Sequence, residues 1–156
     1  MFAAMRLGYI VVPPALVDPF VKARNLLGQS SSAVIESAMA QFMVDGRSVE
    51  HIRKMRRVYR DRRDVLFECL RAECSAVLDV QHTDAGMHML GWLKHGIDDR
   101  TAHETLLNAG IESLPLSVYA SSPLTHDALV LGFTGTHEKH IPKLVKRLGA
   151  VLQTLM

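Results

Sequence analysis

The densest group of chemically active side chains is a run of basic residues near the middle of the chain. Seven of its 18 lysines and arginines fall within eleven positions: Arg53, Lys54, Arg56, Arg57, Arg60, Arg62 and Arg63. On a helix, such residues could follow the phosphates of a nucleic acid. The nearby acids Glu50, Asp61 and Asp64 offset part of this charge. The pattern therefore favours a solvated or interdomain helix face over a nucleic-acid partner.

The eight histidines and two cysteines do not have the spacing of a metal site. His137 and His140 lie three positions apart, one fewer than in the His-Glu-x-x-His pattern that puts two ligands on one helical face. Cys69 and Cys74 lack the Cys-x-x-Cys spacing of zinc ribbons and redox loops. We therefore expect no metal site and reduced cysteines, with Cys69 serving in packing.

Nucleophile and phosphate-loop motifs are also missing from the sequence. A serine nucleophile elbow needs Gly-x-Ser-x-Gly, and a phosphate-binding glycine loop ends in Gly-Lys-Ser or Gly-Lys-Thr. Neither pattern occurs, and the segment from Gly132 to Gly135 has glycines without a nucleophile. The residues by themselves predict no complete catalytic set.

The composition is that of a globular domain without a membrane span. The 156 residues are 48% hydrophobic and 22% charged, with a formal net charge of +2. These values exclude disordered and coiled-coil classes and give no general reason for a polyanionic partner. The longest apolar stretch, Leu7 to Val17, is interrupted by Pro13 and Pro14 and is too short to cross a bilayer. We expect a cytoplasmic protein.

The first half of the sequence predicts one strand followed by three helices. Arg6 to Val12 is short, rich in β-branched residues and stopped by two prolines, which is typical of a buried strand. Turn residues then separate helices expected at 14–27, 33–44 and 48–74. Because a buried strand needs partners, we expect further structure upstream of it.

The second half predicts a small sheet with covering helices. Strands are expected at 76–81, 87–93, 111–116 and 128–133, with a helix at 98–108 between the second and third. A final helix carries an apolar stripe from Ile141 to Leu155. The fold class is therefore α/β (α+β), with a sheet of about four strands covered by helices.

Five segments carry a family resemblance: Met5–Pro14, Met55–Asp64, Gly86–His88, Leu114–Tyr119 and Leu129–Phe133. Together they resemble the C-terminal part of a fold-type I aminotransferase dependent on pyridoxal 5'-phosphate (PLP). Within that group they resemble most the aminotransferase-like domain of MocR-branch, GntR-type transcriptional regulators. The resemblance implies that residues 1–47 are the tail of the large cofactor-binding domain and residues 48–156 the small C-terminal domain.

The resemblance implies one cofactor contact, Arg6, which corresponds to a ligand of the PLP phosphate. A planar guanidinium suits bidentate phosphate binding. The family's Schiff-base lysine lies a few residues before that arginine, where Met1 to Met5 contain no lysine. The aspartate and the aromatic residue that hold the PLP ring belong to the family's upstream half. PLP is thus implied for the parent family, with no catalytic residue and no bound cofactor in this chain alone.

A second departure concerns the substrate. Many aminotransferases hold the substrate carboxylate with an arginine in the strand before the last helix, and Leu129 to Phe133 contains none.

We expect an inactive C-terminal fragment that forms a homodimer or pairs with an upstream-half partner chain, associating through the Leu7–Val12 edge or the first two helices. The alternatives are a working transaminase completed by a partner chain, with Tyr119 near the active-site mouth, and a regulatory or DNA-associated interaction module.

Overall fold

The computed structural model describes residues 6–28, 31–84 and 86–156. The chain divides into two compact units, Met1–Met55 and Arg56–Met156. No helix in the described ranges is long and apolar enough to cross a membrane. The expected mixed fold of helices and a four-stranded sheet is confirmed.

The first unit is helical. A 3-10 turn, η2 (Pro14–Leu16), leads into α1 (Val17–Leu26), and α2 (Ala33–Val44) follows. The prolines suit a helix start because their missing N–H has no partner there in any case. Gly28 and Gly46 end the two helices at φ values of +64° and +76°, a region that glycine enters without strain. The predicted helices 14–27 and 33–44 are confirmed.

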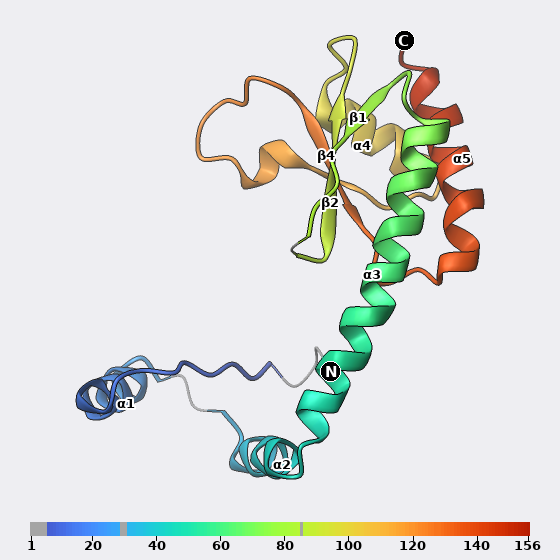
Figure 1. The fold of residues 1–156 in the computed structure, drawn as a ribbon. Coiled ribbons are helices and arrows are strands. Elements are labelled where there is room, and N and C mark those ends of the chain that lie inside the picture. Colours follow the sequence, from blue (N-terminus) through green and yellow to red (C-terminus); the bar gives the residue numbers. More distant parts are fainter. Residues whose placement is uncertain (1–5, 29–30, 85) are drawn as a thin grey trace. The chain divides into compact units, whose positions relative to one another are not determined.

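The segment from Arg6 to Val12 is not the buried strand that its sequence predicts. It has no strand pairing and runs as an extended trace before η2 (Figure 1). Tyr9, Ile10 and Val11 are 73%, 74% and 86% exposed. A strand exists through hydrogen bonds to a neighbouring strand, and the described residues supply none to this segment. Local β propensity alone therefore does not make it a strand.

The second unit contains one antiparallel sheet. Its strands are β1 (Leu78–Val80), β2 (His88–Leu93), β3 (Leu114–Pro115) and β4 (Ala128–Gly132), in the order β1-β2-β4-β3. All four predicted strands are present, although β3 is much shorter than expected. Pro115 has no N–H to donate, and the chain turns directly into the 3-10 helix η3 (Leu116–Tyr119).

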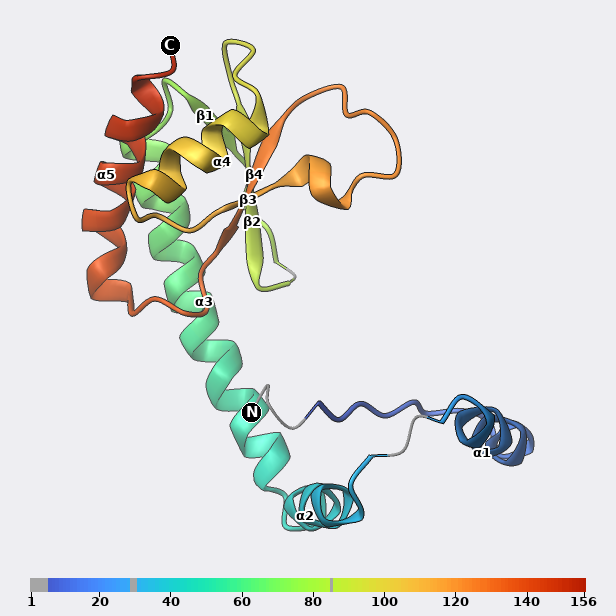
Figure 2. The same ribbon diagram turned by 180° about the vertical axis from the view of Figure 1, so that it is seen from behind.

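Three helices gather on one side of this sheet, as both views show (Figures 1 and 2). They are the C-terminal part of α3 (Arg47–Glu73), α4 (Asp99–Asn108) and α5 (Ile141–Gln153), which the short η4 (Glu138–His140) precedes. The core between helices and sheet includes the fully buried Leu70, Met89, Leu106, Leu129 and Leu152. On α5 the buried residues Ile141, Val145, Leu148 and Leu152 recur at helical spacing.

At Gly149, α5 lies close to the end of α3. A Cβ built on Gly149 would meet Cys74 Sγ and the Glu73 carbonyl oxygen, each at 3.1 Å. The Cys74 thiol lies 3.6 Å from the Val145 carbonyl oxygen, and burial raises its pKa to about 11. Cys74 is therefore a packing residue and not a reactive thiolate.

Replacing Gly149 with leucine should destabilise the second unit. The added side chain would push against backbone and a buried sulfur, so we expect a loss of about 1–3 kcal/mol in the free energy of unfolding. Urea unfolding followed by circular dichroism measures the loss. The control is Ala150→Leu, one position along the same helix but exposed, which should change stability by less than about 0.5 kcal/mol. Equal effects of the two substitutions would contradict close packing at Gly149.

Candidate functional site

Arg6 is an exposed residue at the beginning of the described chain. Its φ is +49°, in the left-handed region that residues other than glycine seldom adopt. Within the described residues its guanidinium has no hydrogen bond or ion pair. Arg6 is therefore available to an anion. Its role as a PLP phosphate ligand stays a prediction.

The lysines of the chain lie on other elements, and all of them are exposed. They are Lys22 on α1, Lys54 on α3, Lys94 after β2, Lys139 in η4, and Lys143 and Lys146 on α5. Lys94 Nζ donates to the Ser75 carbonyl oxygen at 2.7 Å. A lysine that forms a covalent bond with a cofactor works in a desolvated pocket or beside another cation, where its amine loses its proton. The exposed positions of these six do not provide burial of that kind.

The strand before the last helix, β4, carries no arginine of its own, and Val130 lies at its centre. Val130 is half-buried in β4 and lies opposite Leu90 of β2 and Leu114 of β3. These neighbours are apolar and offer no counter-charge for a substrate carboxylate. The strand that carries the substrate-binding arginine in many aminotransferases thus presents only apolar side chains at this position of the sheet.

One buried carboxylate holds the η3 turn in place. Asp99, only 1% exposed, accepts hydrogen bonds from the backbone N–H and the hydroxyl of Ser117, both at 2.8 Å. Ser117 lies within η3, which ends at Tyr119. Val118 and Tyr119 are 61% and 64% exposed, so the turn presents both side chains to solvent. The sequence does not reveal this link, because Asp99 and Ser117 are 18 positions apart.

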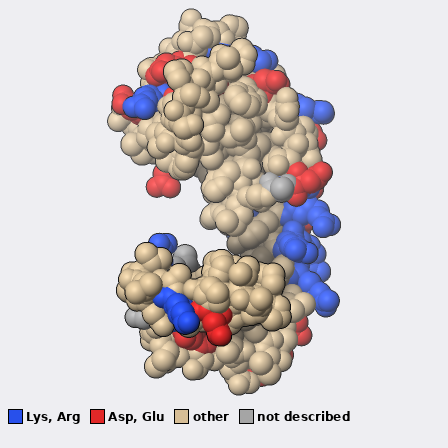
Figure 3. All heavy atoms as spheres, turned by 90° about the vertical axis from the view of Figure 1, so that its left-hand side faces the viewer, with Lys and Arg blue, Asp and Glu red and all other residues tan. Residues whose placement is uncertain are grey.

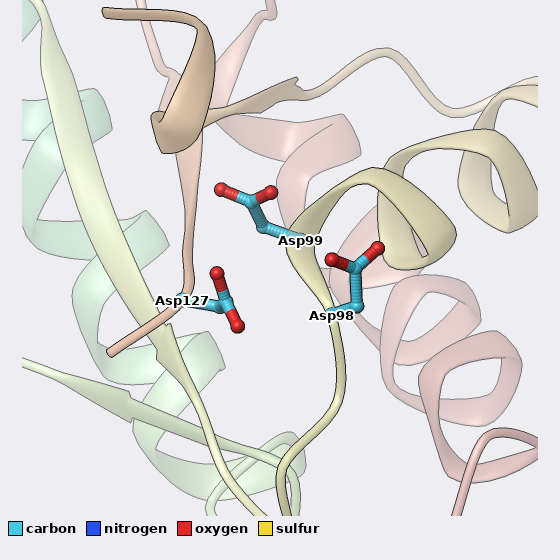
Figure 4. Close-up of side chains that lie close together, drawn as sticks. All are labelled: Asp98, Asp99 and Asp127. Carbon is cyan, nitrogen blue, oxygen red and sulfur yellow. The ribbon is translucent and has the colours of Figure 1, made fainter. Parts of the chain in front are cut away.

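Two further aspartates lie beside Asp99 and form an acidic group with it. Oxygen atoms of Asp98, Asp99 and Asp127 lie within 4.8 Å of one another, and Figure 4 shows the three side chains pointing toward a common space. Asp98 caps α4 by accepting from the Thr101 N–H at 2.8 Å and from its hydroxyl at 2.9 Å. Capping and anchoring of η3 therefore account for two of the three carboxylates, and no histidine belongs to the group.

The three carboxyl groups differ in their ionisation. Hydrogen bonds from Thr101 lower the pKa of Asp98. The pKa of Asp127 is raised, first by desolvation and then by the neighbouring charges of Asp99 and Asp98. Asp127 is thus the member of the group whose charge the fold disfavours.

Two arginines of the basic run connect α3 to loops of the second unit. The Arg62 guanidinium donates to the Thr134 carbonyl oxygen, and its Nε lies 3.5 Å from Glu138. Arg63 donates to the Thr83 carbonyl oxygen at 3.0 Å and pairs with Asp64 at 2.8 Å and Asp84 at 3.1 Å. Their side chains are only 17% and 14% exposed. These two residues therefore have structural roles.

The other members of the run in this unit stay on the surface. Arg56, Arg57 and Arg60 are exposed, and Figure 3 shows basic side chains gathered in one strip. This arrangement agrees with a solvated helix face. Whether a nucleic acid binds there stays a matter of prediction.

A groove of about 770 Å³ lies beside the β3 edge of the sheet. Its apolar lining comes from α4, α5 and β4 and includes Leu107, Leu144 and Leu131. Two polar atoms near it have no hydrogen-bond partner in the described structure, Ser113 Oγ and His103 Nδ1. The sequence analysis missed this groove because its walls come from segments distant along the chain.

Known proteins resemble the chain in sequence and in fold. No protein-family model matches it. The probable rhizopine catabolism regulatory protein MocR of Rhizobium meliloti is 27% identical over 155 residues, which are 99% of this chain and 31% of that protein. The uncharacterized HTH-type transcriptional regulator YhdI of Bacillus subtilis is 26% identical over 95% of this chain and 32% of its own length.

Among solved structures, the α-aminoadipate aminotransferase LysN of Thermus thermophilus is similar in fold, with a TM-score of 0.81 and 20% sequence identity. The similarity covers 93% of this chain and 37% of the LysN chain. The chain has the fold of the C-terminal part of an aminotransferase. It also resembles the aminotransferase-like part of MocR-type regulators over nearly its whole length. The LysN structure is a complex with N-(5'-phosphopyridoxyl)-L-leucine. The chain spans about a third of the length of these proteins.

Replacing Asp99 with asparagine should loosen η3. An amide provides one acceptor oxygen where the carboxylate uses two, so we expect a loss of about 1–3 kcal/mol in stability and faster exchange of the Ser117 amide hydrogen. Hydrogen exchange read by NMR reports both effects. The control, Glu104→Gln, removes an exposed charge from the same helix and should change neither. Unchanged Ser117 exchange in Asp99→Asn would show that the turn does not depend on this carboxylate.

Replacing Asp127 with asparagine should stabilise the protein at neutral pH. Folding raises the pKa of Asp127, so the folded protein holds the proton of this carboxyl more tightly than the unfolded chain does. The stability that this group contributes is complete below its unfolded pKa and is lost as the pH rises through its folded pKa. The neutral amide avoids that loss, so we expect a gain of less than about 1 kcal/mol at pH 7 that disappears under acid conditions. Urea unfolding at two pH values measures it. Asp98→Asn should give no such gain, because the pKa of Asp98 is lowered.

Proposed function

We propose that these 156 residues are the C-terminal part of an aminotransferase-like protein of the MocR regulatory type. One observation carries the proposal: nearly the whole chain aligns with such regulators, and nearly the whole chain superposes on a PLP-dependent aminotransferase. In this assignment residues 48–156 are the small domain and residues 1–47 the tail of the large, cofactor-binding domain. The start of α3 at Arg47 supports a boundary there, and the division into compact units falls two turns later in the same helix.

Arg6 is the residue of this chain that would contact PLP. Its exposed guanidinium, without a partner among the described residues, fits a phosphate group. When bound, PLP supplies an electron sink for amino-acid chemistry, which requires a covalent anchor and a partner for the ring nitrogen. The exposed lysines on α1, α3, η4 and α5 do not fit the anchor role. The chain thus fits the phosphate but not the reactive end of the cofactor, and alone it is catalytically inactive.

The substrate side of the site supports regulation over transamination. Val130 and its apolar neighbours provide no positive charge for a substrate carboxylate. A transaminase could still arise if a partner chain supplied the lysine and the missing contacts. The relatives named as transcriptional regulators favour a ligand-sensing role in which the fold binds and does not convert its ligand.

The purified 156-residue chain should not bind PLP at a single lysine. We expect no saturable change in absorbance during PLP titration, and only scattered, substoichiometric labelling of exposed lysines after borohydride reduction and mass spectrometry. Saturable labelling of one lysine would contradict the proposal. Loss of that labelling in Arg6→Ala, but not in Arg24→Ala, would then place an active cofactor site within this chain.

Fusing the chain to the upstream part of the Rhizobium meliloti MocR relative tests Arg6 directly. If the fusion binds PLP, Arg6→Ala should weaken binding by about 10-fold or more, because a charge-assisted phosphate contact is lost. Arg24→Ala, which removes an exposed arginine paired with Glu36, is the matched control and should leave binding unchanged. Equal PLP affinities of the fusion and its Arg6→Ala variant would remove Arg6 from the site.

A further inference from the structure

We draw no further inference here: the strongest candidate, the apolar groove beside the β3 edge with the buried Ser113 hydroxyl that has no hydrogen-bond partner among the described residues, belongs to a chain that spans about a third of the length of its relatives, and nothing in the structure shows what covers it.

Discussion

The contact between α5 and the end of α3 is the constraint on which the second unit depends. Gly149 allows the two helices to approach so closely that a single added carbon would lie 3.1 Å from Cys74 and from the Glu73 backbone. This contact aligns Leu70, Cys74, Val145 and Leu152 over the sheet as one apolar surface. Protein interiors are packed so closely that adding one methylene group is felt by the neighbouring atoms. The position of α5 against α3 therefore requires a residue without a side chain at Gly149.

Polar side chains then fix the loops that this core leaves free. Arg62 and Arg63 hold the loops after β4 and before β2 against α3. Asp99 does the same for η3 through Ser117. Each of these partly buried charges has a defined partner, which is the condition under which burial of charge is tolerated. Arg62, Arg63 and Asp99 therefore position loops, and Asp98 caps α4.

The surfaces that lack partners point beyond the isolated chain. Arg6 is exposed, Tyr9, Ile10 and Val11 are 73–86% exposed, and the groove beside β3 is open to an occupant. The chain spans about a third of the length of the regulators and aminotransferases that it resembles.

The sequence by itself determined the helices, the four strands of the second unit and the family resemblance. The stripe of α5, the glycine stops after α1 and α2, and the four short apolar runs are local patterns, because helix and strand periodicity depends on neighbouring positions. Tertiary structure decided what those patterns could not express. It left Arg6–Val12 unpaired, shortened β3 at Pro115, and brought Asp127 beside Asp98 and Asp99. It also gave Arg62 and Arg63 carbonyl partners 72 and 20 positions away. These outcomes depend on hydrogen bonds and contacts between segments that are distant along the chain. A single sequence does not show which residues become partners in the fold.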